Sequence, residues 1–230
     1  MATSCLVCPY LSSCILGGQG RSTIRRFSDS LKRLLFQGKG KIVFHQGDPF
    51  DGYYLLCEGS AKLVKVLKGG RQVIIEVLVP FSMLNLIPEK ENPRHECTAV
   101  TISESCEVAY ISEARLTALV KQFSPLGWEL AGYLSGVLRT TGRLLACMKL
   151  PVRDRLLAYL AGKLAQSRLE HNRHVIPIPV TQRELAEIIQ TTPETLSRSL
   201  RALRNEGIVR PRKGGIEILR ADLVKDFFDD

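Results

Sequence analysis

The chain has 230 residues and carries a net charge of +9, with 45% hydrophobic residues. No apolar run approaches the roughly 18 residues that a membrane-spanning helix needs, and the N-terminus has no basic segment ahead of an apolar core. These properties argue against a membrane protein and against an exported one, and they leave room for two modest domains. A basic balance favours a polyanionic partner such as nucleic acid; a surplus that serves only solubility is the alternative.

The chain contains seven cysteines, an odd number that does not fit a framework of disulfides. Because no export signal is visible, we expect free thiols in a reducing cytoplasm. Three of the thiols stand close together near the N-terminus, whereas the others are spread over the rest of the chain. The cysteines are Cys5, Cys8, Cys14, Cys57, Cys97, Cys106 and Cys147.

Residues 1–20 are rich in cysteine and then in glycine, and they predict an arm without a core of its own. Residues 22–36 follow as an amphipathic segment, which predicts a helix. The apolar side chains of this segment recur near helical spacing at Ile24, Phe27, Leu31, Leu34 and Leu35.

From about Gly38 to Ser112 the sequence consists of short β-type runs that are separated by turn residues such as Gly69-Gly70. Many short strands at this spacing predict a small sandwich or barrel, here a jelly-roll-like β-roll. The runs are residues 41–45, 53–57, 61–67, 72–78, 98–101 and 107–111.

Residues 113–149 are helical in pattern, and their second part carries an apolar stripe in steps of three and four residues. The stripe is close to a coiled-coil seam, so we interpret the segment as a dimerisation helix. A helix that packs on its own domain is the alternative. The stripe comprises Leu126, Leu130, Leu134, Val137, Thr141, Leu145 and Met148.

Leu150 and Pro151 interrupt the helical pattern and mark a hinge. After the hinge, residues 152–168 predict another amphipathic helix, and residues 175–180 predict a short extended run. A separate C-terminal domain is therefore expected over residues 150–230.

Residues 181–204 predict two short helices that are joined by a tight turn at Gln190-Thr191. Thr181 and Glu184 have the spacing of a capping box at the start of the first helix. Thr192 is placed to cap the second helix, and the proline that follows it suits a first helical position, where a missing N–H costs nothing.

The second of these helices has two distinct faces. Leu196, Leu200 and Leu203 form an apolar stripe, whereas another face is polar and suits the major groove of DNA. We therefore interpret the pair as a helix-turn-helix with its second helix as the recognition helix. An ordinary amphipathic pair with a solvated face is the alternative. The predicted DNA-binding residues are Glu194, Ser197, Arg198 and Arg201, together with Thr181.

Residues 207–219 predict a β-hairpin behind the helix-turn-helix. Arg212 and Lys213 stand beside its Gly214-Gly215 turn, which predicts a wing whose cations contact phosphates.

The order of β-roll, long helix, hinge and winged helix-turn-helix resembles the CRP/FNR family of bacterial transcription regulators. Residues 47–62, which look like the first β-roll hairpin of that family, and the helix-turn-helix carry the resemblance. It implies an α+β fold and a cytoplasmic homodimer that binds double-stranded DNA and RNA polymerase. The implied domains are a Cys-rich arm at 1–20, a cyclic-nucleotide-binding-like β-roll at 21–123, a dimerisation helix at 124–149 and the DNA-binding domain at 150–230.

Two features resemble the FNR branch of the family. The spacing Cys5-x2-Cys8-x5-Cys14 is similar to the N-terminal arm of that branch, and Cys106 stands where the branch keeps a remote fourth cysteine. The resemblance implies that these four thiolates ligate a [4Fe–4S] cluster, whose conversion by oxygen weakens the dimer and its DNA binding. The recognition helix also resembles that branch, which reads TTGAT-type inverted repeats, at Glu194, Ser197 and Arg198.

Other interpretations of the sensor stay open. Zinc takes the same four thiolate ligands, and a thiol–disulfide switch, a haem on His45 or His95, and a small ligand in the β-roll are further possibilities. Cys97 competes with Cys106 as fourth ligand. An iron–sulfur redox protein that does not bind DNA is the alternative from another class. The remaining cysteines are expected to be inert buried thiols, namely Cys57, Cys97 and Cys147.

Cyclic nucleotides are not expected as ligands. The loop at residues 79–86 lacks the Gly-Glu pair that the cyclic-nucleotide branch of the family uses. The position of that branch's phosphate-holding Arg-Ser pair falls on Glu96-Cys97, where an acidic side chain would repel a phosphate. The sequence also contains no nucleophile elbow, P-loop or zinc-protease motif, so we predict no enzymatic activity.

Overall fold

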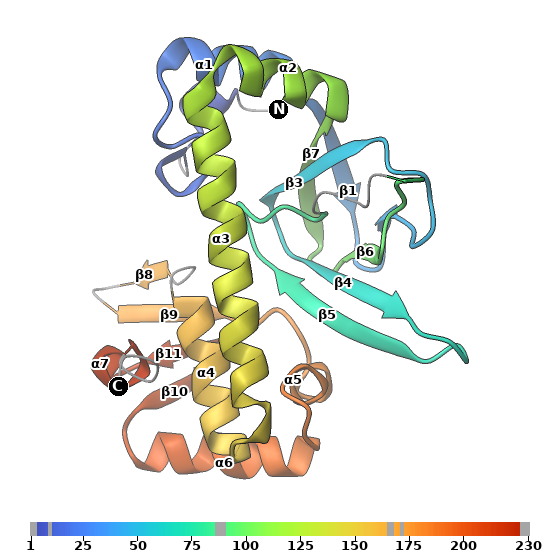
Figure 1. The fold of residues 1–230 in the computed structure, drawn as a ribbon. Coiled ribbons are helices and arrows are strands. Elements are labelled where there is room, and N and C mark those ends of the chain that lie inside the picture. Colours follow the sequence, from blue (N-terminus) through green and yellow to red (C-terminus); the bar gives the residue numbers. More distant parts are fainter. Residues whose placement is uncertain (1–3, 9–10, 86–90, 165–167, 171–172, 226–230) are drawn as a thin grey trace. The chain divides into compact units, whose positions relative to one another are not determined.

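A computed structural model of the chain describes residues 4–8, 11–85, 91–164, 168–170 and 173–225 (Figure 1). The chain divides into two compact units, residues 1–136 and 137–230. Both units combine helices with antiparallel sheets, which confirms the predicted α+β class. Within the described ranges, no helix is long and apolar enough to cross a membrane.

The first unit contains the predicted β-roll, which consists of two sheets with the strand orders β1-β7-β3 and β2-β6-β4-β5. Six of its strands coincide with the β-type runs of the sequence, and β1 is additional. The strands are β1 (Lys32–Gln37), β2 (Ile42–Phe44), β3 (Gly52–Glu58), β4 (Ala61–Val66), β5 (Gln72–Leu78), β6 (Thr98–Thr101) and β7 (Ser105–Ser112).

The β1-β7-β3 sheet separates two hydrophobic cores. Because side chains alternate along a strand, even-numbered residues such as Leu56 and Val108 point toward the second sheet, where both are fully buried. Odd-numbered residues such as Leu55 and Ala109 point the other way, toward the N-terminal segments and the helices. We call these the inter-sheet core and the arm-facing core.

The N-terminal arm packs into the arm-facing core. It contains two short 3-10 helices, η1 (Cys5–Val7) and η2 (Leu11–Ser13), and leads into helix α1 (Arg21–Asp29). Leu16 is buried in that core, and the backbone N–H of Cys5 donates to Ser28 Oγ of α1 at 3.2 Å. The arm therefore has no separate core, as predicted, but it shares the core of the β-roll.

The helix predicted over residues 22–36 is wrong in its second half. Helix α1 ends at Asp29, and the following residues form β1, which pairs with β7. Leu34 packs on the inter-sheet core whereas Leu35 is 65% exposed, as alternation in a strand requires. Pairing with β7 decides the conformation here, because periodicity alone cannot assign so short an apolar run.

Helices α2 (Glu113–Gln122) and α3 (Ser124–Ala146) and the 3-10 turn η3 (Cys147–Lys149) confirm the predicted helical region. The predicted dimer stripe is partly wrong, however. Leu126 is fully buried in the arm-facing core and Leu130 packs against it, so this part of α3 packs on its own domain. Trp128 and Leu138, which the prediction did not include, are instead 80% and 74% exposed.

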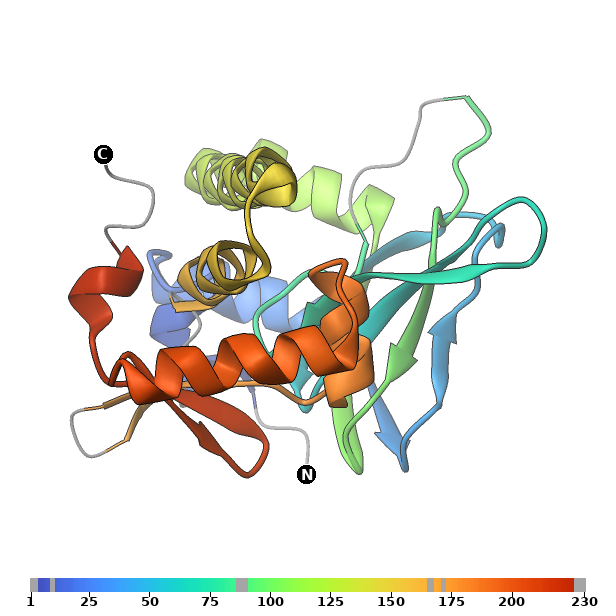
Figure 2. The ribbon, with the colours of Figure 1, turned by 90° about the horizontal axis from the view of Figure 1, so that it is seen from below.

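The second unit is the predicted winged helix-turn-helix, around one hydrophobic core (Figure 2). Its four-stranded sheet has the order β10-β11-β9-β8. The helix predicted over 152–168 is too long, because it is described only as far as Leu164 and Arg168 already belongs to β8. The elements are α4 (Val152–Leu164), β8 (Arg168–Glu170), β9 (Arg173–Pro177), α5 (Gln182–Ile188), α6 (Pro193–Asn205), β10 (Val209–Arg212), β11 (Gly215–Ile218) and α7 (Ala221–Lys225).

Candidate nucleic-acid interface and thiol cluster

The two helices of the helix-turn-helix begin where the sequence predicts. The Thr181 side chain accepts from the Glu184 N–H at 3.2 Å and the Glu184 carboxylate accepts from the Thr181 N–H at 2.9 Å, which completes the capping box of α5. Thr192 Oγ1 accepts from the Thr195 N–H at 3.3 Å and caps α6. The Thr181 side chain, a predicted DNA contact, is thus exposed but also serves as a cap.

The turn between α5 and α6 is held from α4. Gln190 has a φ of 55°, in the left-handed region that residues other than glycine seldom adopt. Arg155 Nη1 donates to the carbonyl oxygens of Ile189 and Gln190 at 3.0 and 2.8 Å. Carbonyls at the end of a helix have no partner within it, so the guanidinium satisfies two of them at once.

Helix α6 buries one stripe and exposes another. Leu196 and Leu203 are fully buried, which orients the helix on the core of the unit. Arg198 is exposed, and its Nη2 atom donates to Thr195 Oγ1 at 3.0 Å. The predicted reading residues share one face by helical spacing: Glu194, Arg198 and Arg201 are exposed, and Ser197 is half-buried between them.

The Glu194 carboxylate is kept ionised at the start of α6. A hydrogen bond with its own backbone N–H, then one with the Thr192 hydroxyl, and finally the charge of Arg198 lower its pKa. The ionised form can only accept hydrogen bonds, which is the role that a cytosine amine requires of a side chain.

The hairpin of β10 and β11 confirms the predicted wing but changes the role of Arg212. Lys213 is exposed at the turn, beside Gly214 with a φ of 76°. Arg212 donates from Nε to Glu217 Oε2 at 2.8 Å, and its Nη2 lies 2.6 Å from the same oxygen. Because Glu217 is only 1% exposed, Arg212 is engaged within the hairpin, neutralising a buried charge. The sequence analysis missed Glu217, an acidic residue between two isoleucines.

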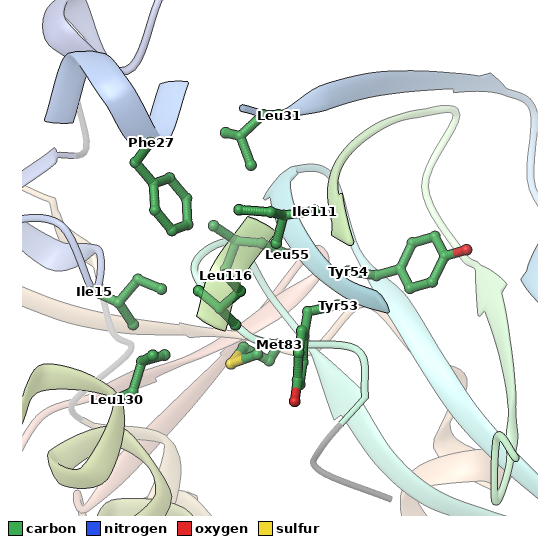
Figure 3. A pocket seen from close by; sticks show the side chains of 10 residues that line it. All are labelled: Ile15, Phe27, Leu31, Tyr53, Tyr54, Leu55, Met83, Ile111, Leu116 and Leu130. Atoms are coloured by element: carbon green, nitrogen blue, oxygen red, sulfur yellow. The ribbon is translucent and has the colours of Figure 1, made fainter. Parts of the chain in front are cut away.

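A small hollow in the arm-facing core is lined by apolar side chains and tyrosine rings (Figure 3). Ile15 of the arm and Phe27 of α1 approach it from one side, and Leu55, Leu116 and Leu130 complete the lining with other side chains of the first unit. Among the described residues that line it there is no cationic group, so it offers no partner for a phosphate.

The three arm thiols gather at the same core. Cys5 is buried there and Cys14 packs against it, while Cys8 is half-buried. Burial raises the pKa of the Cys14 thiol, and the charges of Cys5 and Cys8 add to the increase, so the three sulfurs lie within electrostatic reach. Arg33 Nη2 donates to Cys5 Sγ at 3.3 Å, and the same guanidinium forms an ion pair with Glu107.

The fourth predicted ligand, Cys106, does not join them. It is fully buried in the inter-sheet core, on the other face of the β1-β7-β3 sheet. Its neighbour Glu107 points to the arm side and reaches Arg33. The rival Cys97 also packs on the inter-sheet core. Sequence position placed Cys106 correctly on β7, but adjacent residues of a strand face opposite sides.

Cys57, which was expected to be inert, lies on the arm side instead. It packs against the arm-facing core together with Cys14. Burial raises the pKa of the Cys57 thiol to about 12, although Arg33 lowers it, and Glu107, Cys5 and Cys14 raise it further. Within the described part of the chain, no three of these side chains are spaced closely enough to hold a metal ion.

Both halves of this arrangement match known domain families. Residues 37–123 match the sequence model of the cyclic nucleotide-binding domain, and residues 154–227 match that of the Crp-like helix-turn-helix domain. The chain belongs to the CRP/FNR family of DNA-binding transcription regulators. Within this family, its first unit supplies the β-roll and its second unit the DNA-binding domain.

Relatives in the CRP/FNR family cover most of the chain. The cyclic AMP receptor protein of Thermus thermophilus is 29% identical over 192 residues, which is 82% of this chain and 84% of the relative. The nitrogen fixation regulation protein FixK of Bradyrhizobium diazoefficiens is 25% identical over 224 residues, with 94% and 90% covered. The structure of FixK2 from Bradyrhizobium japonicum has the same fold, with a TM-score of 0.70 at 18% identity over 86% of this chain and 96% of that one.

The β-roll of this CRP/FNR-family protein differs from a phosphate site at two points. Glu96, at the position of the phosphate-holding pair, forms an ion pair with Lys65 at 3.0 Å. Asn85 accepts from the Tyr54 N–H at 2.9 Å and donates to the Gly52 carbonyl at 2.7 Å, which fixes the loop that would approach a ligand. These contacts are in keeping with the expectation that no cyclic nucleotide binds.

Proposed function

We propose that the protein is a homodimer that reads inverted repeats of TTGAT-type half-sites and is gated by an oxygen- or redox-sensitive [4Fe–4S] cluster on its N-terminal arm. The observation that carries the DNA-binding part is the polar face of α6, where Glu194, Arg198 and Arg201 are exposed behind a well-capped N-terminus. The gathering of the arm thiols supports the sensor. We further propose that it acts in the cytoplasm and contacts RNA polymerase at its promoters.

The half-site assignment follows from the chemistry of α6. A TTGAT half-site contains a single G·C pair, so one arginine and one carboxylate suffice to read both of its bases. Arg198 would donate two hydrogen bonds to the guanine, and Glu194 would accept one from the cytosine amine. The half-buried Ser197 lies between them for a neighbouring base.

The dimer would form along the exposed face of α3. Trp128, Leu138 and Leu145 are 80%, 74% and 67% exposed, which is unusual for such large apolar side chains. They are linked by the smaller Ala131, Ser135 and Gly142 in steps of three and four residues, the pattern of a two-stranded helical seam. A two-fold axis along this seam would present one recognition helix to each half-site.

Contacts of the arm offer a route from the thiols to that helix. Ile15 and Leu16, which directly follow Cys14, share the arm-facing core with Leu126 and Leu130 at the start of α3. A change in the position of the arm would therefore repack this part of α3. To act as a switch, the closed arm must favour the dimer by a coupling of about 1–3 kcal/mol.

The residues present fit a four-thiolate group in part. Cys5, Cys8 and Cys14 would hold it from the arm, and the fourth thiolate would come from the β-roll. When bound, a [4Fe–4S] cluster supplies an oxygen-labile link between the arm and the sheet. Each cysteine would release its proton on ligation, and Arg33 would supply positive charge beside the sulfurs.

Other sensors have weaker support. Zinc or a thiol–disulfide switch would use the same arm thiols. A haem has little to favour it, because His95 is 4% exposed and stacks on Phe44 with ring centroids 4.0 Å apart. The apolar hollow could take a small uncharged ligand. A redox protein without specific DNA binding is not favoured by the polar face of α6.

Anaerobic purification followed by DNA-binding titrations tests the proposal. We expect a broad visible absorption band, about four irons and four sulfides per chain, and tight binding to a TTGAT inverted repeat but not to its scrambled form. Air should bleach the band and weaken the specific binding. A colourless protein that still reads the repeat would refute the cluster and keep the regulator, whereas equal affinity for both DNAs would refute specific reading.

A further inference from the structure

We propose that Cys57 on β3, rather than Cys106 on β7, supplies the fourth thiolate to the site of Cys5, Cys8 and Cys14. The inference rests on the proposed function, since it names a ligand of the same sensor. It applies equally to an iron–sulfur cluster and to a single thiolate-bound metal ion.

The two faces of the β1-β7-β3 sheet decide between the candidates. Cys57 belongs to the arm-facing core, with the buried Cys5 and the half-buried Cys14. Cys106 belongs to the inter-sheet core, among aromatic and aliphatic side chains of both sheets. To reach the arm, Cys106 would have to turn through the sheet and leave a void in a fully packed core, which costs free energy.

A row of arm-facing residues places Cys5 over the strand that carries Cys57. Arg33 and Leu55 both pair with Ala109, so the three side chains lie side by side across β1, β7 and β3. Arg33 reaches Cys5 Sγ from this row at 3.3 Å. Cys57 lies two residues beyond Leu55 on the same face, where the charges of Arg33, Cys5 and Cys14 all act on it.

The backbone at Cys57 is suited to re-aim its side chain. The pairing of β3 with β7 shifts register between Leu56 and Glu58, so Cys57 lies in a β-bulge. Bulges free a residue from the regular ladder and often redirect its side chain next to a functional site. The Cys57 thiol donates only a long bond, 3.8 Å, to the Leu55 carbonyl, so little holds it in its present orientation.

Charge also favours the arm side. Four thiolates together carry a large negative charge, and the guanidinium of Arg33 lies among Cys5, Cys57 and Glu107. On ligation each thiol gives its proton to solvent, which a neighbouring cation assists. The charged neighbour that acts on Cys106 is Glu58, a carboxylate that opposes a second negative charge.

Two matched variants of the full chain test the assignment, Cys57→Ala and Cys106→Ala. Each is reconstituted anaerobically with ferrous iron and sulfide, and iron and sulfide are counted per chain. We expect Cys106→Ala to match the wild-type content and Cys57→Ala to lose most of it under the same conditions. A loss confined to Cys106→Ala, or a full cluster in both variants, would overturn the proposal. Circular dichroism of the metal-free proteins confirms that both variants fold.

A titration with Co²⁺ alone separates this proposal from the proposed cluster, because the thiolate-to-cobalt charge-transfer absorption grows with the number of thiolate ligands. If the wild type binds Co²⁺ but assembles no iron–sulfide cluster, a band reduced by about one quarter in Cys57→Ala and unchanged in Cys106→Ala supports the Cys57 assignment and refutes the cluster. An unchanged band in Cys57→Ala overturns the assignment. A wild type that binds neither probe overturns both.

Discussion

Arg155 Nη1 donates to the carbonyl oxygen of Gln190 at 2.8 Å, and so ties α4 to a residue of left-handed backbone in the helix-turn-helix turn. Arg155 belongs to the helix that directly follows the Leu150-Pro151 hinge. The conformation of the turn, and with it the placement of α6 relative to α5, therefore depends on a side chain outside the helix-turn-helix itself.

Replacing Arg155 by alanine should destabilise the DNA-binding unit. The variant loses charge-assisted hydrogen bonds to two carbonyls, and we expect a loss of about 2–3 kcal/mol in unfolding free energy. Urea unfolding measures it. Arg155→Lys is the control, since one ammonium can replace only part of the pair and should lie between. Unfolding midpoints that match the wild type for both variants would contradict this role.

Replacing Arg198 by alanine should relax sequence discrimination. We expect the preference for the TTGAT repeat over a G·C-substituted repeat to fall by about 1–3 kcal/mol, because a bidentate guanine contact is lost. Arg204→Ala is the matched control, since Arg204 is exposed on α6 but away from the reading face. Titrations at fixed salt measure both. If Arg198→Ala weakens binding to all sequences equally, as expected of Arg204→Ala, Arg198 contacts phosphate.

The two cations of the wing should behave differently. Lys213→Ala should weaken binding to any DNA and reduce the slope of log affinity against log salt by about 1, as the loss of one phosphate contact requires. Arg212→Ala should lower stability as well, because it leaves the buried Glu217 with one charge partner fewer. Thermal unfolding in the absence of DNA distinguishes the two. Equal stability of both variants would contradict the structural role of Arg212.

A charge in the exposed face of α3 should dissociate the dimer. Leu138→Glu places a carboxylate in the proposed seam, and we expect a monomer in light scattering and a large loss of affinity for the inverted repeat. Leu223→Glu, at a 44% exposed leucine of α7, is the control and should stay dimeric. Dimers in both variants would show that the seam lies elsewhere.

The metal-free protein should lose stability in alkaline solution. The pKa of the Cys57 thiol is raised to about 12 by burial, above the roughly 8.5 of an exposed thiol. Because the folded value is the higher one, its contribution is complete below pH 8.5 and is lost as the pH rises toward 12, on the order of 1 kcal/mol per pH unit. Denaturant unfolding between pH 8 and 10 measures this loss. Cys57→Ala should show a shallower dependence, and identical slopes would contradict the assignment.

The sequence alone predicted the helix-turn-helix almost to the residue, because its signals are local. A cap at Thr181 and another at Thr192 act within one helical turn, and the apolar stripe of α6 needs only one core to pack on. The β-type runs were likewise correct because alternation and turn residues are short-range signals. Strand β1 was missed because only its pairing with β7, some seventy residues away, makes it a strand.

The candidate sites show the same division. Glu194 and Arg198 were found because helical spacing places them on one face. The contact of Arg155 with Gln190 spans 35 residues and left no local signal. Cys106 was chosen by its place along the chain, and Cys57 was set aside, because a column of sequence does not tell which side of a sheet a side chain faces.

The sheet under the arm has a further consequence for how such sensors change over time. A thiol that serves the arm must have the right parity on its strand, but it need not stay on the same strand, because neighbouring strands offer side chains at the same height. A ligand could therefore be lost from one strand and regained on the next while the fold and the bound group stay where they are. Relatives whose cysteines do not align could share one sensor, and relatives whose cysteines do align could lack it if the register is shifted by a single residue.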